Sequence, residues 1–281
     1  MPELPEVETI RLGLQKYLVG HKIIDVQIKV PKIFVGKKGD VVGAEITGLK
    51  RIGKGLIIEL DNDFVLAIHL KMTGQLIYQD GKTKNIALSA KTGGTTLPSK
   101  YSHIIFILDN GAFLYYNDLR RFGWIKVVRK DQLMQVPFFK EMGPEPFKDL
   151  TPEKFKEIVS KSNLVIKVLL MNQKKIGGIG NIYANDALFE AKIMPSRKAK
   201  SLSSQEIKKL YGSILKVLQK SLDYGGSSDE NFVNALGQEG NYQNHTLIYG
   251  REGEKCRVCG GIIKKIKLGG RGTYFCAICQ N

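Results

Sequence analysis

Four cysteines near the end of the chain constrain its fold more than any other feature of the sequence. They form two C-x2-C pairs, which residues 260–275 separate: Cys256, Cys259, Cys276 and Cys279. Four thiolates in two such pairs suit a tetrahedral zinc ion, and two disulfides or four unrelated thiols are the alternatives. Because four sulfur ligands leave zinc no open position, the spacing predicts one structural Zn²⁺ without a catalytic role.

The segment between the two cysteine pairs has the pattern of a β-hairpin. The runs IIKKIKL (262–268) and TYFCAIC (273–279) are joined by GGRG, which places glycines at the turn and Arg271 at the tip. Three lysines add positive charge: Lys264, Lys265 and Lys267. A small basic hairpin suits contact with phosphates or with a nucleic-acid groove, and a solubilising turn is the alternative.

The charge balance indicates a polyanionic partner. Among 281 residues, 43 lysines and arginines outnumber 27 acidic residues, which gives a formal net charge of +16. This balance favours nucleic acid or an anionic membrane surface, with a solvated surface tuned for solubility as the alternative. No apolar run approaches the ~20 residues that span a bilayer, and no apolar stretch resembles a secretory signal. We therefore expect a soluble intracellular protein, and disulfides are rare in that setting.

Residues 1–130 have the pattern of one helix followed by β-strands. The helical pattern covers 7–20 and places four apolar residues on one face: Val7, Ile10, Leu14 and Leu18. Strand-like stretches follow at 23–30, 41–60, 64–78, 102–110, 112–118 and 124–129. Short strands with Gly, Asn and Asp between them predict a sandwich or a barrel. The polar stretch 79–102 predicts a long mobile loop.

A proline-rich linker separates this region from a helical one. Its prolines are Pro144, Pro146 and Pro152. Thr151 is a suitable N-cap, and Pro152 suits the first helical position. Helical patterns follow at 151–160, 163–171, 181–191 and 203–223. The polar stretch 223–241 shows no strong periodicity.

Two motifs place polar or cationic groups in turns. GGIGN (177–181) matches no nucleotide-binding pattern, but Asn181 stands where a helix begins, and free N–H groups there attract phosphate. A capped structural turn explains the same residues. In YNDLRRFG (116–123), two arginines adjoin an aromatic side chain, as in proteins that insert a wedge into a duplex. The alternative is a hairpin loop with Phe122 in the core and both arginines solvated.

The N-terminal stretch MPELPEVET concentrates acids and prolines on an otherwise basic chain. Removal of the initiator Met would leave Pro2 with a secondary amine, whose pKa near 7.7–8.0 keeps a useful fraction nucleophilic. Attack on a carbonyl-like carbon would give a charged iminium, with Glu3 and Glu6 placed to move protons. The alternative is a helix start, with Pro5 at the first position and Glu8 near the positive end of the helix dipole.

Taken together, eight segments resemble the bacterial formamidopyrimidine-DNA glycosylase family. They occur in order over nearly the whole chain: PELPEVET, RIGKGL, HLKMTG, YNDLRRFG, MGPEP, GGIGNIYANDALF, YGREGEKCRVCG and GGRGTYFCAICQ. The resemblance implies an α+β fold, with an N-terminal β-sandwich packed with the first helix and a helix-two-turn-helix domain that carries a zinc-bound β-hairpin. It implies duplex DNA between the domains, with the damaged nucleotide flipped out of the stack.

The resemblance also implies roles for individual residues. Pro2 attacks C1′, Glu3 is the general acid and Glu6 lies at the damaged base. Lys54 corresponds to a second catalytic residue that contacts phosphate. A wedge, a reader of the opposite base and a third side chain fill the vacated space: Phe122, Arg120 and Met72. Further DNA contacts are implied for His69, His103, Arg121, Asn181, Tyr249, Lys265 and Arg271. Excision of oxidised purines such as 8-oxoguanine and β,δ-elimination at abasic sites would follow.

Two other functions fit parts of this pattern. Pyrimidine-directed enzymes of the endonuclease-eight type usually begin Pro-Glu-Gly-Pro, so Pro2-Glu3-Leu4-Pro5 favours the purine-directed branch. A non-catalytic zinc-hairpin DNA-binding protein is the alternative from another class. Lys71, before MTG, and Leu119, before the arginine pair, depart from the family pattern. We expect a cytoplasmic, nucleoid-associated monomer with a catalytic domain, a linker, a helical domain with a lesion-capping loop, and a zinc hairpin: 1–130, 131–150, 151–241 and 242–281.

Overall fold

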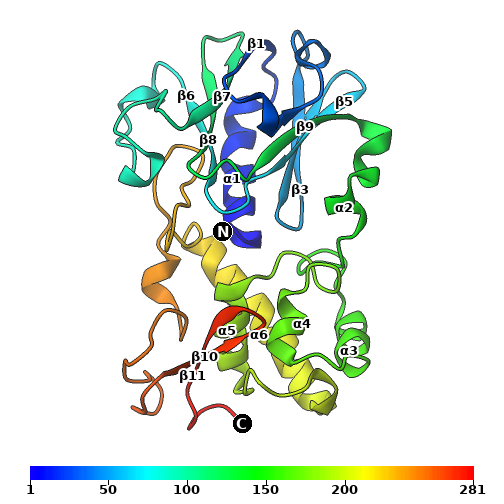
Figure 1. The fold of residues 1–281 in the computed structure, drawn as a ribbon, viewed down its shortest axis with the longest axis vertical. Coiled ribbons are helices and arrows are strands. Elements are labelled where there is room, and N and C mark those ends of the chain that lie inside the picture. Colours follow the sequence, from blue (N-terminus) through cyan, green and yellow to red (C-terminus); the bar gives the residue numbers. More distant parts are fainter. The chain divides into compact units, whose positions relative to one another are not determined.

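The chain folds into two units, and each unit is built from two separate stretches of sequence. The computed structural model describes all residues, 1–281. Unit 1 comprises 1–140 and 222–243, and unit 2 comprises 141–221 and 244–281 (Figure 1). The stretch that follows the longest helix therefore returns to the N-terminal unit. No helix of the structure combines the length and the apolar character that a membrane span requires.

Unit 1 contains helix α1 (Leu4–Leu18) and two β-sheets. The four-stranded sheet has the order β1 (Ile23–Ile28), β7 (Ser102–Leu108), β8 (Phe113–Asp118) and β6 (Gly74–Gln79). The five-stranded sheet has the order β2 (Phe34–Val35), β9 (Trp124–Arg129), β5 (Phe64–His69), β4 (Gly55–Leu60) and β3 (Ile46–Ile52). All neighbouring strands are antiparallel except β2 and β9, which are parallel.

One hydrophobic core joins the two sheets and α1. Phe106 of the four-stranded sheet and Ile58 of the five-stranded sheet belong to the same buried cluster. The four apolar residues that the helical pattern placed on one face are each at most 1% exposed: Val7, Ile10, Leu14 and Leu18. The helix begins at Leu4, earlier than the pattern indicated, because Pro5 is compatible with a first helical turn. The expected sandwich with a flanking helix is confirmed.

Strands β4 and β5 of the five-stranded sheet are buried on both of their faces. In β4, the consecutive residues Leu56, Ile57 and Ile58 are all buried, so the strand shows no alternation of apolar and polar side chains. Ile57 packs in a second cluster with Val136 and Phe139, from the segment that includes α2 (Pro137–Lys140). A sheet covered on both faces reads as a continuous apolar run, as this stretch of the sequence does.

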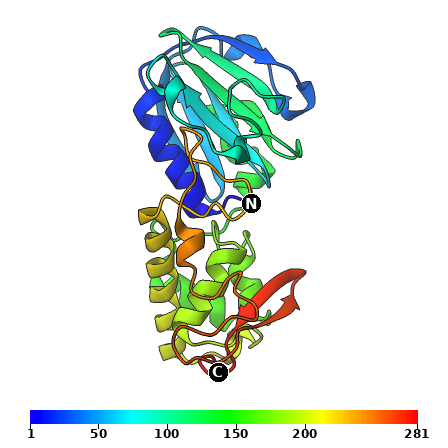
Figure 2. The ribbon, with the colours of Figure 1, turned by 90° about the vertical axis from the view of Figure 1, so that its left-hand side faces the viewer.

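Unit 2 consists of four helices and a two-stranded hairpin. The helices are α3 (Pro152–Ser160), α4 (Ile166–Met171), α5 (Asn181–Ala191) and α6 (Ser204–Asp223). The expected cap of α3 is confirmed, since Thr151 Oγ1 accepts a hydrogen bond from the Lys154 backbone N–H. Helix α4 begins later than the pattern indicated, because Val165 is extended and bridges to Lys198. The hairpin strands are β10 (Lys264–Leu268) and β11 (Arg271–Phe275) (Figure 2).

The polar stretch expected as a mobile loop has a defined path in unit 1. It contains two short 3-10 turns, Thr83–Asn85 and Ala90–Thr92. Asp80 Oδ1 accepts hydrogen bonds from the backbone N–H groups of Lys82 and Thr83 at 2.8 and 2.7 Å. Other 3-10 turns lie at Pro31–Ile33, Lys38–Asp40, Lys130–Gln135, Ala199–Ser201 and Tyr242–His245.

Candidate active site

The acidic N-terminal turn is a buried structure centred on Glu6. Glu3 and Glu6 are 3% and 1% exposed, and Pro2 is also buried. Glu6 Oε2 accepts a hydrogen bond from the Glu3 backbone N–H at 2.7 Å, as the three-residue spacing at a helix start allows. Glu6 Oε1 accepts a second bond from the Ser227 backbone N–H at 2.8 Å. One carboxylate thus connects the start of α1 to a loop more than two hundred residues away in sequence.

The terminal amine lies beside the same loop. The Met1 ammonium is 2.8 Å from Glu230 Oε2, and both groups are partly exposed. Removal of Met1 would transfer the terminal amine to Pro2, which precedes the two buried acids directly. The arrangement therefore brings a prospective amine nucleophile and two carboxyl groups together in unit 1. The helix-start interpretation also holds, because the same residues begin α1.

Lys54 lies in the turn between β3 and β4 and is 4% exposed. Gly55 of β4 pairs with His69 of β5, which brings the lysine close to the histidine. Burial, together with the charges of Lys71 and Lys54, lowers the pKa of His69 to about 3. The His69 ring packs edge-on against Phe138 with 4.4 Å between ring centroids. His69 is therefore a neutral, buried side chain next to the buried Lys54.

The resemblance implied a phosphate contact for both His69 and His103, and the structure places both side chains in the interior. They are 4% and 3% exposed. His69 Nδ1 accepts a hydrogen bond from the Lys71 backbone N–H at 2.8 Å, and His103 Nε2 donates to the Asp118 carbonyl at 2.9 Å. One nitrogen of each ring is thus bonded to the main chain nearby, which fixes the orientation of the ring. A phosphate contact of either histidine stays a prediction.

The free energy of unfolding is expected to fall as the pH decreases from 6.5 towards 3. In this range the unfolded chain binds a proton at His69 and the folded chain does not, because its folded pKa is about 3. The contribution is about 1.4 kcal/mol per pH unit, or about 2 kcal/mol between pH 6.5 and 5. His69→Asn retains an acceptor for the Lys71 N–H but cannot titrate. Urea unfolding at several pH values should show a smaller pH slope in this variant, and an equal slope would contradict the assignment.

The loops that carry Met72, Arg120 and Phe122 are held together by Asp118. This fully buried carboxylate accepts from the Thr73 hydroxyl, and its two oxygens also accept from the backbone N–H groups of Arg120 and Gly123. Arg120 N–H donates to Thr73 Oγ1 as well, at 3.0 Å. The structure therefore holds the turn with Met72 and Thr73 next to the loop with Arg120 and Phe122, although about fifty residues separate the two in the sequence. Neither Asp118 nor Thr73 was predicted as a site residue.

Phe122 projects from this loop pair. It is 55% exposed, so the alternative that placed it in the core is wrong. The Arg120 guanidinium lies over its ring at 4.6 Å from the centroid, and Arg121 is exposed with a positive φ of 55°. Lys71 has a positive φ of 52° beside the half-buried Met72. An exposed aromatic ring with a guanidinium group over one face can stack on or between bases.

In unit 2, Lys167 joins the glycine-rich turn to the hairpin. Its side chain is fully buried, and the ammonium donates to Asn181 Oδ1, the Gly272 carbonyl and Thr273 Oγ1 at 2.7–2.8 Å. Asn181 is the first residue of α5, as expected. A buried ammonium with three oxygen partners fixes the start of α5 relative to β11. Lys167 was not predicted as a site residue, because it lies within the apolar run that forms α4.

Two further buried residues of α5 position the expected contact residues. Asn185 Oδ1 accepts from the Tyr274 backbone N–H at 2.8 Å. Asp186 accepts from three consecutive backbone N–H groups, those of Leu247, Ile248 and Tyr249. The residues expected to contact DNA lie on the segments that these bonds connect. Tyr249 packs edge-on against the Tyr274 ring, and Lys265 pairs with Glu252 at 3.0 Å. Arg271 is exposed directly after the Gly269-Gly270 turn.

The four cysteines lie close enough to share one metal ion. All four Sγ atoms are within 4.8 Å of one another, and none forms a disulfide. The Cys256–Cys279 and Cys259–Cys276 Sγ distances are 3.8 and 3.4 Å. Four sulfur atoms at ~2.3 Å from a tetrahedral zinc are ~3.8 Å apart, so the donor set fits zinc, and the two-disulfide alternative does not match.

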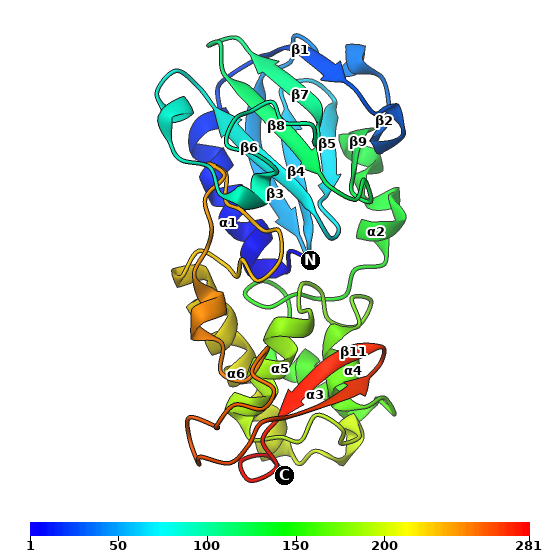
Figure 3. The same cartoon turned by 60° about the vertical axis from the view of Figure 1, so that its left-hand side comes forward.

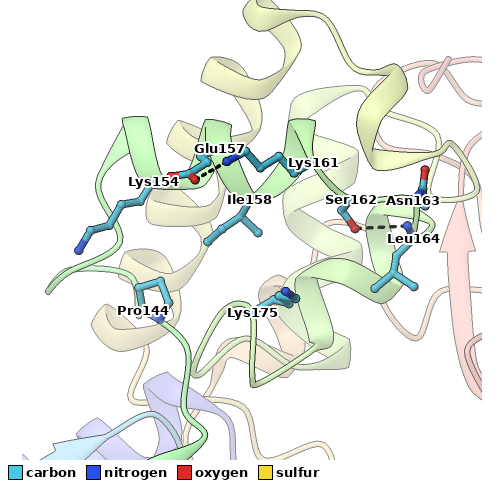
Figure 4. A pocket seen from close by; sticks show the side chains of 9 residues that line it. All are labelled: Pro144, Lys154, Glu157, Ile158, Lys161, Ser162, Asn163, Leu164 and Lys175. Carbon is cyan, nitrogen blue, oxygen red and sulfur yellow. Dashed lines mark hydrogen bonds and ion pairs between the residues drawn. The ribbon is translucent and has the colours of Figure 1, made fainter.

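A pocket with a volume of about 490 Å³ lies elsewhere in unit 2 (Figure 4). Its lining combines apolar and charged side chains: Pro144, Lys154, Glu157, Ile158, Lys161, Ser162, Asn163, Leu164 and Lys175. Glu157 is its only carboxylate, and it pairs with Lys161 at 2.8 Å. The pocket contains none of the expected site residues, so we do not assign the reaction to it.

Comparison with known proteins identifies the family. The family model for the formamidopyrimidine-DNA glycosylase N-terminal domain matches residues 1–125, and the model for the H2TH domain of the same enzymes matches 142–232. The chain belongs to the formamidopyrimidine-DNA glycosylase family. A third model, the zinc finger found in FPG and IleRS, matches 253–281.

Individual members of this family are similar over their full length. Formamidopyrimidine-DNA glycosylase of Listeria monocytogenes serotype 4b is 39% identical, and alignment covers 100% of both chains. The enzyme of Pelotomaculum thermopropionicum is 40% identical over 100% of this chain and 99% of its own. Lactococcus lactis Fpg in complex with N7-benzyl-Fapy-dG DNA has a TM-score of 0.87 at 38% identity, with 100% of both chains covered. Its complex with abasic-site DNA gives 0.87 at 37% identity and 99% coverage of both chains.

As a formamidopyrimidine-DNA glycosylase family member, the chain is a DNA glycosylase and abasic-site lyase of base excision repair. The alternative of a non-catalytic zinc-hairpin protein is therefore set aside. The expected α+β fold with a helix-two-turn-helix domain is confirmed, as is one structural zinc held by four cysteines: Cys256, Cys259, Cys276 and Cys279.

Proposed function

We propose that this glycosylase removes oxidised purines from duplex DNA, with Pro2 as the nucleophile after Met1 is removed. The observation that carries the proposal is the Glu6 carboxylate, which bonds both the Glu3 N–H and the Ser227 N–H. It holds a loop beside the position where the Pro2 amine would be. A nucleophile, two buried acids and a covering loop are the parts that base excision at C1′ requires.

The proposed reaction uses the chemistry of a secondary amine. The Pro2 lone pair forms a bond to C1′ while the glycosidic bond breaks and its electron pair leaves with the base. The nitrogen then loses its N–H proton, and the departing base takes up a proton, so that the nitrogen lone pair is free again. Glu3 then gives a proton to the ring oxygen as the sugar opens, which leaves a cationic iminium between Pro2 and C1′. The iminium accepts electrons as C2′ loses a proton and the 3′ phosphate departs, and a second elimination releases the 5′ phosphate.

The remaining expected residues would hold the DNA. Lys54 would bind a phosphate next to the lesion. His69 and His103, each oriented by a hydrogen bond to the main chain, would contact phosphates as well. The exposure of Phe122 suits a wedge, and Arg120 stacked on it suits a reader of the opposite base. Other contacts with DNA are proposed for Met72, Arg121, Asn181, Tyr249, Lys265 and Arg271. The formal charge of +16 supports duplex DNA as the partner, and we propose a cytoplasmic monomer bound to the nucleoid.

The substrate branch is tested by direct competition between lesions. Two duplexes of the same sequence carry either 8-oxoguanine or thymine glycol, and borohydride traps the covalent intermediate. We expect faster excision and more trapped adduct with 8-oxoguanine. Faster excision of thymine glycol would assign the chain to the pyrimidine-directed branch instead. Binding of both duplexes without adduct or strand cleavage would contradict the proposed amine chemistry.

A further inference from the structure

The polar segment 80–101 lies against the loop 226–240 within unit 1. The two appear side by side, one teal and one yellow to orange, in Figure 3. The Ser89 backbone N–H donates to the Gly237 carbonyl at 2.9 Å. Gly237 has a positive φ of 76°, which favours glycine, and a Cβ atom there would lie 2.5 Å from Leu88 Cδ2, at the end of a leucine side chain. The segment is therefore packed against the loop and is not free in solvent.

Charged side chains strengthen this contact. The Lys91 ammonium donates to Glu239 Oε2 at 2.8 Å and also to the Ser228 carbonyl. Ser89 Oγ donates to the other oxygen of Glu239 at 2.6 Å. The hydrogen bonds from Lys91 and then Ser89 hold the pKa of Glu239 below its ordinary value, so the carboxylate is charged at neutral pH. Lys91 thus joins both ends of the loop.

A buried amide completes the connection. Gln75 of β6 is fully buried, and its Nε2 donates to the Lys91 carbonyl at 2.9 Å and to the Asn231 carbonyl at 2.7 Å. The segment and the middle of the loop are therefore tied to the same strand. Because a buried amide that loses a partner is destabilising, Gln75 favours the docked arrangement over an open one.

The opposite side of the loop touches the N-terminal groups. Ser227 N–H donates to Glu6, and Glu230 pairs with the Met1 ammonium. Gly226 has a positive φ of 85°, and a Cβ there would lie 3.2 Å from the Glu6 side chain and 2.9 Å from the Phe232 ring. The loop is thus held between segment 80–101 and the group of residues proposed to react.

We propose that segment 80–101 is a brace that orders the loop 226–240 beside the reactive amine before DNA binds, with Lys91 as its positioning residue. This inference rests on the proposed function, because it assigns the loop to the damaged base. The damaged base is bonded to C1′, which is the atom that the amine attacks. A loop beside the amine is therefore expected to contact the damaged base when DNA is bound. A loop ordered in advance loses less conformational entropy when the base enters. Because an abasic site has no base, we expect the brace to have no effect on cleavage at abasic sites.

The test compares two variants in the same segment. Lys91→Met removes the ammonium and retains the stem. Lys84→Met is the control, because Lys84 is exposed and its side chain forms no hydrogen bond or ion pair. Hydrogen exchange of the free protein should be faster over residues 226–240 in Lys91→Met alone. With 8-oxoguanine duplex, its KM should rise about fivefold to tenfold with little change in kcat, as for the loss of one partly exposed charge network. Abasic-site cleavage should be unchanged.

Further outcomes separate the possible failures. Lys91→Arg should restore both the exchange pattern and the KM, which a general loss of stability would not allow. Equal loss on damaged-base and abasic duplexes, or unchanged exchange in Lys91→Met, would overturn the brace. If the unmodified protein excised neither lesion, the proposed function would fail, and the exchange measurement would still decide whether the brace orders the loop.

Discussion

A chain whose terminal amine is blocked is expected to bind damaged duplex and to leave it uncut. An extension ahead of Met1 keeps the Pro2 nitrogen in an amide, whose lone pair is delocalised and cannot attack C1′. Loss of a covalent nucleophile lowers turnover by at least ~10³-fold. Base release, strand cleavage and the borohydride adduct should therefore fall together to background levels.

The control for this experiment is the same protein with its amine restored. The extension carries a protease site whose cleavage leaves Pro2 as the first residue, and mass spectrometry confirms the terminus. Activity should return on cleavage, whereas affinity for 8-oxoguanine duplex, measured by anisotropy at one salt concentration, should change little. An adduct that persists with the amine blocked would identify another nucleophile, for which the buried Lys54 is the first candidate.

Removal of zinc is expected to weaken duplex binding about 10²-fold while unit 1 stays folded. Without the metal, the cysteine pairs no longer hold the two ends of the hairpin that carries Lys265 and Arg271. Loss of two charge-assisted contacts of about 1.4 kcal/mol each gives this change in affinity. The core of unit 1 contains no hairpin residue, so its unfolding transition should be retained.

The zinc prediction is checked by chelation to zero bound metal. Anisotropy then gives the affinity, and hydrogen exchange separates residues 253–281 from unit 1. Arg271→Met in the metal-loaded protein should reduce the salt dependence of binding by about one counterion, whereas Lys200→Met, an exposed lysine outside the hairpin, should not. Undiminished affinity after complete metal loss would reject the role of zinc in binding.

Sequence patterns predicted helices well where the determining residues lie close together in the chain. Helix α5 begins at Asn181 and α3 at Pro152, as expected, because caps, prolines and apolar periodicity act within a few residues. The Cys256–Cys259 and Cys276–Cys279 pairs could likewise be identified by spacing alone, since each pair forms its own knuckle. The acidic N-terminal motif also indicated Glu3 and Glu6 as candidate proton-transferring groups, and both are buried.

The residues that organise the site were not predictable in this way. Asp118, Lys167 and Asp186 are fully buried, and each binds groups far away in sequence. In the sequence they resemble ordinary surface charges, because the neighbouring residues do not indicate that these side chains are buried. The burial of His69 and His103 could not be predicted for the same reason.

The sequence by itself determined the periodic helices, the zinc ligands and the family, because each depends on spacing along the chain. Only the tertiary structure decided that Phe122 is exposed and that segment 80–101 packs on the loop 226–240. It also placed this loop on Glu6, although the two are more than two hundred residues apart. The physical reason is that burial and long-range hydrogen bonds depend on how the whole chain packs, so a short sequence motif cannot predict them.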